Sequence, residues 1–443
     1  MLYMENIRKY FGTDGIRGIA NRELTSALAF KCGNALTSLK QKPKIIIGRD
    51  TRKSGDMLSL SVCAGITAGG GSVTDIGIMT SPAAAYVTKA EKADFGIMIS
   101  ASHNPAEFNG IKIFSGDGYK LDDDIEKEIE NFFQFENIAA TEEIGGYKYS
   151  DLSGIYIDSV INNVKCGLKG MKIALDLSNG AAYKLAPEIF KRLGAEVYAV
   201  NDDKNGIIND NCGCLYPEKI KEAVKKYNAD VGFAYDGDAD RLIACEKSGS
   251  LMNGDLIVYI LANYYKENNL LKNNIAVGTH HTNMAIETKL CENGVKLLRS
   301  GIGDRYVVEL MKKTGAVIGG EQSGHVIIGD MATTGDGALV SAKLCEIMCK
   351  TGKTLSELCD FELFPQENVN VKVSDKHGIL NNVILQEHLQ SIEKELGSKG
   401  RILVRASGTE PKIRIMAECY DERLARKIAN GIAEEVNKLA NID

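Results

Sequence analysis

The sequence predicts an α/β fold built from several domains with largely parallel sheets. Short, continuously apolar runs alternate with helical stretches, as buried parallel strands and their covering helices do. Three segments share one plan, in which such a run is followed by a polar loop rich in small residues; they begin at Lys44, Lys172 and Asn274. Their spacing is that of domains and is too long for a solenoid repeat. A length of 443 residues suggests about three domains at roughly 150 residues each.

Polar stretches divide the chain into four segments. The first boundary falls in the polar stretch that ends near Ser153, the second near Gly249–Asn253 and the third near Pro365–Asn370. We therefore expect domains at residues 1–152, 153–252, 253–366 and 367–443. The last segment is short, and its strands at 369–373 and 401–404 precede an amphipathic helix that bears one apolar stripe.

Residues 122–135 predict a helix in the first segment. Apolar residues recur there at three- and four-residue spacing behind Asp122-Asp123-Asp124. The three acids either bind a metal or stabilise the positive end of the helix. We favour the second interpretation, because acidic side chains are common in the first turn of a helix.

Charge and composition exclude several classes of protein. The chain carries 53 Lys+Arg against 59 Asp+Glu, and 44% of its residues are hydrophobic. This is ordinary for a folded protein and too acidic for one that binds the nucleic-acid backbone. No apolar run approaches roughly 18 residues, so we expect no membrane span, and the N-terminus shows no secretory signal. The eleven cysteines lack framework spacing, so we expect free thiols in a reducing cytoplasm.

A candidate nucleophile follows the apolar run Phe95–Ile99. The loop is Ser100-Ala101-Ser102-His103-Asn104-Pro105, and loops at strand ends are where α/β sheets bind ligands. Ser102 is the candidate, although no G-x-S-x-G surrounds it. His103 is a doubtful base for it, because adjacent side chains diverge in an extended chain. Taken alone, the motif is more often a turn.

Three carboxylates occupy alternate positions in Asp236-Gly237-Asp238-Ala239-Asp240-Arg241, after the apolar run 231–234. They repel one another unless a hard cation such as Mg²⁺ or Ca²⁺ binds between them. An EF-hand is excluded, because its sixth and twelfth positions need Gly and Glu and here hold Arg241 and Lys247. A solvated acidic loop and a phosphatase with an aspartate nucleophile both stay open from this motif alone.

Two further loops could bind a phosphosugar. Gly319-Gly320-Glu321-Gln322-Ser323-Gly324-His325 follows the apolar run 316–318 and can present Glu321 and Ser323 to sugar hydroxyls; a plain polar hairpin explains it equally well. Arg405-Ala406-Ser407-Gly408-Thr409-Glu410, with Arg414 on the next strand, offers backbone N–H groups, hydroxyls and guanidinium groups to a phosphate. The alternative is a hairpin with exposed basic residues.

A weaker motif lies near the N-terminus, at Phe11–Gly18. Its three glycines alternate with polar residues, and Arg17 can meet an anion. The spacing fits neither a Walker A loop nor a dinucleotide fingerprint. Together, however, the five motifs describe one chemistry: a serine that carries phosphate, a cation site, a loop that contacts hydroxyls and a distal phosphate clamp form a phosphoryl-transfer site for a phosphosugar. The pieces fall in different segments, so we expect the site in a cleft between four domains.

The motifs, in this order over the whole chain, resemble those of the α-D-phosphohexomutase family. The matching residues are Ser102–Pro105, Asp236–Arg241, Gly320–His325 and Arg405–Pro411. The resemblance implies three similar mixed α/β domains and a smaller α+β C-terminal domain around a central cleft. In chain order, these would carry a phosphoserine, the metal, the sugar-recognition loop and the phosphate-binding loop.

The resemblance also implies roles for individual residues. Ser102 would be phosphorylated, and one Mg²⁺ per active site would be held by Asp236, Asp238, Asp240 and the Ser102 phosphoryl oxygen. Lys112, in Gly110-Ile111-Lys112, would handle a proton or contact phosphate, and His325 would be an acid/base or would only orient its loop. The remaining catalytic candidates are Arg17 and His103. The implied substrate-binding residues are Arg241, Glu321, Gln322, Ser323, Arg405, Ser407, Gly408, Thr409 and Arg414.

The implied reaction converts glucosamine 6-phosphate and glucosamine 1-phosphate into each other. It would pass through bound glucosamine 1,6-bisphosphate, which also activates the enzyme, and would feed UDP-N-acetylglucosamine and cell-wall synthesis. The alternative is a phosphomannomutase/phosphoglucomutase with the same mechanism, because the sugar assignment depends mainly on Gln322 and its neighbours. A non-catalytic sugar-phosphate sensor is disfavoured by the intact Ser102 and three aspartates. We expect a small-molecule substrate, no nucleic-acid or membrane partner, and a homodimer in the cytoplasm.

Two loops depart from the family pattern. Where the amino-sugar branch has C-G-S-T-H-P-E, this chain has Cys212-Gly213-Cys214-Leu215-Tyr216-Pro217-Glu218, so any contact from Ser, Thr or His there is in doubt. A metal at Cys-x-Cys would need two further ligands. Thr279-His280-His281-Thr282-Asn283 replaces a loop of the Met-Ser-Asn type. Two adjacent histidines rarely share a metal without partners, so we interpret this as a substituted loop.

Overall fold

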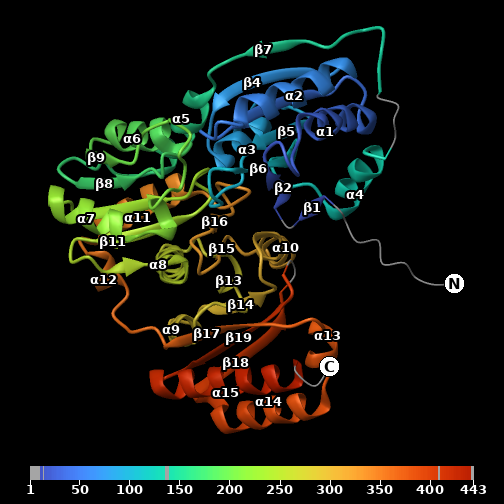
Figure 1. The fold of residues 1–443 in the computed structure, drawn as a ribbon. Helices are drawn as coiled ribbons and strands as arrows, with labels where there is room; N and C mark the ends of the chain where they lie inside the picture. Colours follow the sequence, from blue (N-terminus) through green and yellow to red (C-terminus); the bar gives the residue numbers. More distant parts are fainter. Residues whose placement is uncertain (1–9, 13, 135–138, 408–409, 441–443) are drawn as a thin grey trace. The chain divides into compact units, whose positions relative to one another are not determined.

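The computed structural model describes residues 10–12, 14–134, 139–407 and 410–440 (Figure 1). The chain forms two compact units, Met1–Thr279 with Leu298–Cys359 and His280–Leu297 with Asp360–Asp443. Each unit has a hydrophobic core of its own. The four domain boundaries expected from the sequence remain predictions.

The first sheet has seven strands in the order β1-β2-β6-β5-β3-β4-β7. The interior strand β3 pairs in parallel with β4 and β5, and β6 pairs antiparallel with β5 and β2. Ile45, Ile46 and Ile47 of β3 are all buried, as expected of a strand covered on both faces. The strands are β1 (Phe11–Gly12), β2 (Gly15–Ile19), β3 (Lys44–Arg49), β4 (Ser72–Ile78), β5 (Phe95–Ile99), β6 (Phe108–Ser115) and β7 (Tyr147–Tyr149).

Four helices accompany this sheet, and α1 and α2 pack against each other. The helices are α1 (Ser26–Leu39), α2 (Gly55–Ala68), α3 (Ser81–Ala90) and α4 (Asp123–Phe132). The predicted helix at 122–135 is therefore α4, with Asp122 as its N-cap residue; Phe135 lies outside the described residues. Asp123 pairs with Arg305 and Asp124 with Lys127. Within the described ranges the three acids form no metal-type cluster, which agrees with their role at the helix N-terminus.

The second sheet has the order β12-β11-β10-β8-β9, with β8 parallel to both of its neighbours. Its strands are β8 (Lys172–Asp176), β9 (Glu196–Val200), β10 (Val231–Tyr235), β11 (Leu242–Glu246) and β12 (Leu251–Met252). The associated helices are α5 (Ser153–Asn163), α6 (Ala182–Arg192), α7 (Glu218–Tyr227) and the short 3-10 helix η1 (Gly213–Leu215). All five residues of β10 are buried, so this strand can place the loop after it deep in the protein.

The third sheet has the order β14-β13-β15-β16. Its strands are β13 (Ile275–Thr279), β14 (Lys296–Ser300), β15 (Ile318–Gly320) and β16 (Val326–Ile328). The helices of this part of the chain are α8 (Gly254–Glu267), α9 (Met284–Glu292), α10 (Asp304–Thr314), α11 (Gly337–Thr351) and α12 (Leu355–Leu358), with the 3-10 helix η2 (Lys272–Asn274). The apolar run 316–318 overlaps β15 only at Ile318, and the strand continues through Gly319 and Gly320, which pair with β16.

The second unit contains a three-stranded antiparallel sheet in the order β17-β19-β18. The elements are β17 (Gln366–Lys372), β18 (Gly400–Ala406), β19 (Lys412–Cys419), α13 (Lys376–Leu380), α14 (Val383–Leu396), η3 (Gly397–Lys399) and α15 (Glu422–Ala440). Ile402, Ile413 and Ile415 pack into one core with Ile432 and Val436 of α15. Because side chains alternate along a strand, Arg405 and Arg414 lie on the opposite face. These three mixed sheets and one small antiparallel sheet confirm the predicted fold class.

Two further expectations concern the whole chain. All eleven cysteines lie among the described residues and are free thiols. No helix in the described part of the chain has the length and apolar character needed to cross a membrane.

Candidate active site

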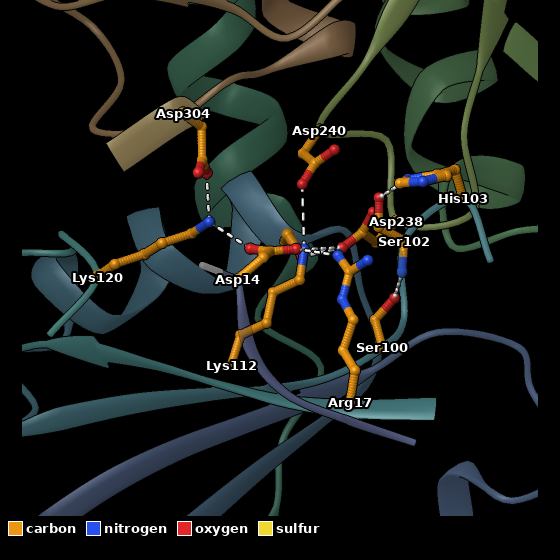
Figure 2. A network of polar contacts seen from close by, with 12 residues as sticks. Asp14, Arg17, Ser100, Ser102, His103, Lys112, Lys120, Asp238, Asp240 and Asp304 are labelled. Carbon is orange, nitrogen blue, oxygen red and sulfur yellow. Dashed lines mark hydrogen bonds and ion pairs between the residues drawn. The ribbon is translucent and has the colours of Figure 1, made fainter. Parts of the chain in front are cut away.

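Four of the five predicted motifs lie in the first unit, and residues of three of them, the Phe11–Gly18, Ser102 and aspartate loops, meet in one polar network (Figure 2). Ser102 follows β5, the aspartate loop 236–240 follows β10, and Lys112 lies on β6. Ser102 and Lys112 are each only 1% exposed, and Asp238 is fully buried. A serine, a lysine and three carboxylates in a site that excludes water are therefore placed for strong electrostatic coupling.

Ser102 is held in a left-handed backbone conformation, with φ of 51°. Its hydroxyl donates to Oδ2 of Asp236 at 2.6 Å, and its backbone N–H donates to Oγ of Ser100 at 2.9 Å. A non-glycine residue at positive φ is uncommon, and such strain persists only where the surroundings over-determine the backbone. The hydroxyl is thus fixed beside the carboxylates by the loop itself.

Arg52 holds much of the Ser102 loop in place. Its guanidinium donates to the carbonyl oxygens of Ser102 at 3.0 Å and Asn104 at 2.8 Å, and Nε donates to Asp50 at 2.9 Å. Asn209 donates to the same Ser102 carbonyl at 2.8 Å. The sequence did not identify Arg52, because an isolated arginine carries no spacing signal; the Gly48-Arg49-Asp50 loop after a buried strand was the only indication of polar residues there.

The three aspartates form the metal-type group that their spacing predicts. One oxygen from each of Asp236, Asp238 and Asp240 lies within 4.8 Å of the other two. Oδ1 of Asp238 and Oδ1 of Asp240 are buried and find no hydrogen-bond partner among the described residues. Buried polar atoms without partners are costly, and carboxylate oxygens are the ligands that hard divalent cations prefer. The residues present therefore fit a bound Mg²⁺.

The carboxylates are unequal in their electrostatic environments. Burial raises the pKa of Asp236 well above its usual range, and repulsion from Asp240 and Asp238 adds to the increase. Burial would also raise the pKa of Asp240, but attraction to Lys112, His325 and Arg241 lowers it well below its usual range. Among these carboxylates, the negative charge of Asp236 is therefore disfavoured and that of Asp240 is favoured.

Lys112 is the main positive charge inside the cluster. Its Nζ lies 2.8 Å from Oδ2 of Asp238, 3.1 Å from Oδ2 of Asp240 and 3.1 Å from Oδ2 of Asp14. Burial alone would lower the pKa of Lys112, but Asp14, Asp238 and Asp240 raise it well above its usual range. Lys112 is therefore a firmly charged ammonium group in this arrangement.

A chain of charges extends from Lys112 that the sequence did not reveal. Asp14 also pairs with Lys120, and Lys120 pairs with Asp304 at the start of α10 (Figure 2). Burial opposes ionisation of Asp14, but Lys112, Lys120 and Arg17 lower its pKa strongly. Asp14 lies inside the Phe11–Gly18 motif, so the sequence did indicate polar site residues at this position. Lys120 carries no motif, so only tertiary structure could bring it here.

Arg17 and His103 lie beside the serine loop. Arg17 pairs with Asp14 and donates to Oδ1 of Asn104 at 3.3 Å. Nδ1 of His103 lies 3.3 Å from the Ser102 hydroxyl. Burial, with Arg241 and Arg17 nearby, lowers the pKa of His103 to about 3. His103 is thus a neutral and weakly basic ring, which supports the doubt about it as a base for Ser102.

His325 lies next to the aspartate cluster, beside Asp240. Nε2 accepts the backbone N–H of Gly335 at 3.0 Å, so the neutral ring carries its proton on Nδ1, which lies 3.8 Å from Oδ1 of Asp240. Burial alone would lower the pKa of His325, but Asp240, Asp304 and Glu321 raise it. The Gly335 bond fits a loop-orienting role, and the acid/base role stays a prediction.

The predicted sugar loop forms the tight turn between β15 and β16. Glu321 is half-buried; its Oε1 accepts from the backbone N–H of Gly303 at 3.1 Å, and burial raises its pKa. Gln322 is half-buried and Ser323 is exposed. Gly324 has φ of 95°, and a Cβ there would lie 2.2 Å from the carbonyl oxygen of Leu242, so only glycine fits this close approach.

Arg241 links this turn to the aspartates. Its backbone N–H donates to Oδ1 of Asp236 at 3.1 Å, and the next residue, Leu242, donates its own N–H to the carbonyl of Gly324 at 3.0 Å. Burial would lower the pKa of Arg241, but Asp236 and Asp240 raise it. The structure therefore brings Glu321 and His325 of this turn to the aspartate cluster through charge interactions with Arg241 and Asp240, while Ser323 is exposed.

The predicted phosphate clamp lies in the second unit. Arg405 and Arg414 are directly opposite each other on β18 and β19. Nε of both arginines and the hydroxyl of Ser407 are buried and have no hydrogen-bond partner within the described part of the chain. Burial lowers the pKa of Arg405, and repulsion from Arg414 contributes. Like charges opposite each other are destabilising, so this face favours an anion. Gly408 and Thr409 lie outside the described residues.

The atypical Cys212–Glu218 loop lies near the aspartates. Cys214 is buried, and burial and the charge of Asp236 raise the pKa of its thiol. Gly213 donates its N–H to Oδ2 of Asp176 at 2.8 Å. Over the described ranges, the aspartates are the only group of three or more His, Cys, Asp or Glu that could hold a metal, so neither Cys-x-Cys nor His280-His281 adds a site of that kind.

Four family models match the chain in order. Each describes a domain of phosphoglucomutase/phosphomannomutase: α/β/α domain I matches residues 8–139, domain II 155–249, domain III 253–364 and the C-terminal domain 369–435. Together they match far more than half of the chain.

Curated relatives and solved structures agree with these models. The phosphoglucosamine mutase of Clostridium acetobutylicum is 45% identical, covering 98% of this chain and 100% of its own, and that of Shouchella clausii is 44% identical over 97% and 99%. A phosphoglucomutase/phosphomannomutase family protein of Burkholderia thailandensis has a TM-score of 0.82 at 23% identity, covering 97% of both chains. The Aspergillus fumigatus N-acetylphosphoglucosamine mutase, solved with GlcNAc-6P and magnesium, has a TM-score of 0.70 at 18% identity, covering 98% of this chain and 96% of its own. These two structures support the fold.

Proposed function

Because this chain belongs to the phosphoglucomutase/phosphomannomutase family, we propose that it is an enzyme that converts glucosamine 6-phosphate and glucosamine 1-phosphate into each other. Curated phosphoglucosamine mutases that are 43–45% identical over nearly the full chain support this substrate. The phosphomannomutase/phosphoglucomutase alternative is not favoured by these relatives. Net chemistry is an isomerisation, because one phosphoryl group leaves the sugar and another joins it.

One observation carries the mechanism: the Ser102 hydroxyl lies 2.6 Å from Asp236 inside the buried aspartate cluster. In the proposed cycle, the phosphoryl group on Ser102 Oγ passes to the free hydroxyl of the substrate; that hydroxyl gives up its proton, and Ser102 Oγ gains one in exchange. The product is bound glucosamine 1,6-bisphosphate. After this intermediate turns round, its other phosphoryl group returns to Ser102 and the exposed sugar oxygen regains a proton.

Asp236, Asp238 and Asp240 would hold Mg²⁺ together with an oxygen of the Ser102 phosphoryl group. When bound, such a cation supplies positive charge that stabilises the transferring phosphoryl group. Lys112 adds a fixed ammonium charge in the same place, and Arg17 and Arg241 add guanidinium charges. The raised pKa of Lys112 favours electrostatic contact with phosphate over action as a base.

The second unit would hold the phosphate that does not react. Arg405 and Arg414, with Ser407, offer donors without partners on one sheet face. Binding there contributes to affinity and to orientation rather than to bond breaking. Glu321, which interacts electrostatically with Arg241 and His325, and the half-buried Gln322 are the proposed contacts to sugar hydroxyls and to the amino group.

A substrate-preference assay tests the proposal. We expect turnover of glucosamine 6-phosphate to exceed that of glucose 1-phosphate and mannose 1-phosphate, with glucosamine 1,6-bisphosphate as activator. A preference for glucose on the order of 100-fold, which is within the reach of a few contacts, would contradict it. A homodimer and a cytoplasmic location rest on the family resemblance and on free thiols suited to a reducing compartment; light scattering decides the first.

A further inference from the structure

A positively charged cavity lies on the open face of the β17-β19-β18 sheet. Its volume is about 240 Å³. The polar residues that line it are His281, Asn368, Asn370, Arg405 and Arg414. Because Nε of both arginines has no hydrogen-bond partner among the residues that the structure describes, the cavity offers donors to an anion. His281 comes from the loop before α9, which belongs to the same compact unit.

Several side chains of the second unit hold the backbone of this loop through its carbonyl oxygens. Arg401 donates to the carbonyl oxygens of His280 at 2.9 Å and Thr282 at 2.6 Å, and Gln366 donates to the His281 carbonyl at 3.1 Å. Asn283 donates to the carbonyl of Phe364 at 2.8 Å. Replacement of the imidazole should therefore leave the loop in place.

The imidazole contacts the clamp directly. Nε2 of His281 lies 3.4 Å from Nη2 of Arg405. A guanidinium group can only donate, so Nε2 accepts and Nδ1 carries the proton of the neutral ring. By contrast, the side chain of His280 is exposed and is absent from the cavity lining.

The charges that face His281 are unbalanced. Burial lowers the pKa of His281 to about 4, and Arg405, Arg401, Arg414 and His280 contribute. Glu418 neutralises Arg401, and Glu410 pairs with both Arg414 and Lys412. Asn368 and Asn370 on β17 bring no charge. Arg405 has no carboxylate among its described partners, so positive charge dominates around the ring.

We propose that His281 is an additional ligand of this cavity, and that it takes up a proton from solvent when a phosphate group binds beside Arg405 and Arg414. Three arginines near the ring disfavour a charged imidazole. An incoming phosphate adds negative charge beside them and so favours imidazolium. Imidazolium can then donate to a phosphate oxygen. The inference rests on the proposed function only for the source of that phosphate, a phosphosugar; free inorganic phosphate has the same chemistry.

Histidine NMR of the full-length protein tests the site without relying on catalysis. The six histidines give few ring ¹³Cε1 signals, and variants at positions 280 and 281 assign the two neighbours. Inorganic phosphate is expected to shift the His281 signal and to raise its midpoint of titration by more than about one pH unit, while His280 moves little. No response at His281, or an equal response at both rings, overturns the proposal.

Enzyme kinetics with the phosphosugar provide a second, independent test of His281. His281→Ala is expected to raise KM about tenfold with kcat within about twofold, as loss of a hydrogen bond to a charged group predicts. His281→Gln keeps polar atoms but cannot titrate, so the ratio of its KM to that of the wild type should grow as pH falls from 8 to 5.5. This ratio cancels titration of the phosphate itself. His280→Ala is the matched control and should resemble the wild type.

The two arms separate this inference from the proposed function. If no hexose phosphate is isomerised but inorganic phosphate still shifts and protonates His281, the proposed function fails and the anion site stands. If isomerisation is normal and both His281 variants match His280→Ala at every pH, the proposed function stands and the role of His281 is refuted.

Discussion

The ammonium nitrogen of Lys112 lies 2.8 Å from Oδ2 of Asp238, and both side chains are almost completely buried. This contact places a permanent positive charge inside the group of carboxylates that would hold a divalent cation. Together, Lys112 and a bound cation would neutralise the charges of the three aspartates and of a phosphoryl group on Ser102. The balance explains why the site tolerates so many buried acids.

Removal of the Lys112 charge should impair both catalysis and stability. Lys112→Met is expected to lower kcat on the order of 100-fold or more, because a preorganised charge is lost. It should also lower the free energy of unfolding by about 3–5 kcal/mol, since buried carboxylates lose their partner. Lys112→Arg keeps the charge and should recover stability better than activity. Exposed Lys191→Met on α6 is the control, and a Lys112→Met enzyme with normal kcat would contradict the assignment.

Ser102→Ala should abolish isomerase activity. The hydroxyl is the proposed carrier, and no other described hydroxyl donates to Asp236. Intact-mass spectrometry should show one phosphoryl group on a fraction of the wild type and none on the variant. Ser248→Ala, in an exposed turn, should keep both the phosphoryl group and the activity. An active Ser102→Ala enzyme would refute the mechanism.

Neutralisation of Asp236 should separate stability from cation binding. Its pKa is raised by burial and by repulsion from Asp240 and Asp238, so Asp236→Asn removes an unfavourable charge and should preserve or increase the Tm in the presence of EDTA. Mg²⁺ at 100 times its Kd stabilises a protein by about 2.7 kcal/mol. We expect wild-type Tm to rise with Mg²⁺ and the variant to lose most of that rise. An unchanged Mg²⁺-dependent shift in Asp236→Asn would remove Asp236 from the cation site.

A pH-dependent prediction concerns Asp336, the N-cap of α11. Its carboxylate accepts from the Leu339 N–H at 3.0 Å and from the Tyr156 hydroxyl at 2.6 Å, yet burial raises its pKa from 3.8 to about 6. Between pH 4 and pH 6 the folded state therefore binds more protons than the unfolded state. The free energy of unfolding falls as pH rises through this window, by about 3 kcal/mol from this group at 1.36 kcal/mol per pKa unit.

Asp336→Asn provides the measurement for that prediction. Asparagine also caps helices well and does not ionise, so the variant should gain stability relative to the wild type as pH rises from 4 to 7 in urea unfolding. Tyr156→Phe removes a hydrogen bond that favours the carboxylate and should enlarge the pH dependence. A difference between wild type and Asp336→Asn that is constant over this range would show that the carboxyl is not perturbed.

Local pattern was sufficient for most of the strands that carry the site. The apolar run Phe95–Ile99 is β5 without a shift of either end, and the run 231–234 is β10 with one more residue. Buried parallel strands are recognisable because both faces are apolar. The apolar run 316–318 and the strand β15 overlap only at Ile318. The strand includes Gly319 and Gly320, which pair with β16 but have no apolar side chain that would mark them as part of a strand.

The tertiary partners of the site could not be derived in the same way. Spacing found the three aspartates because one loop supplies them all. The chain of charges that extends from Lys112 comes from separate loops: Asp14 precedes β2, Lys120 follows β6 and Asp304 begins α10. Ion pairs between such distant positions leave no periodicity in the chain. Ser81, which donates to Asp238, was hidden for the same reason.

The left-handed backbone at Ser102 restricts which amino acid can occupy that position. Threonine has an equivalent hydroxyl, but a β-branched side chain at positive φ is a genuine conformational outlier. Glycine and asparagine adopt such angles readily and have no hydroxyl to phosphorylate. The main-chain torsion angle at this position therefore favours serine over threonine. Ser102→Thr should distort the loop before it affects the chemistry.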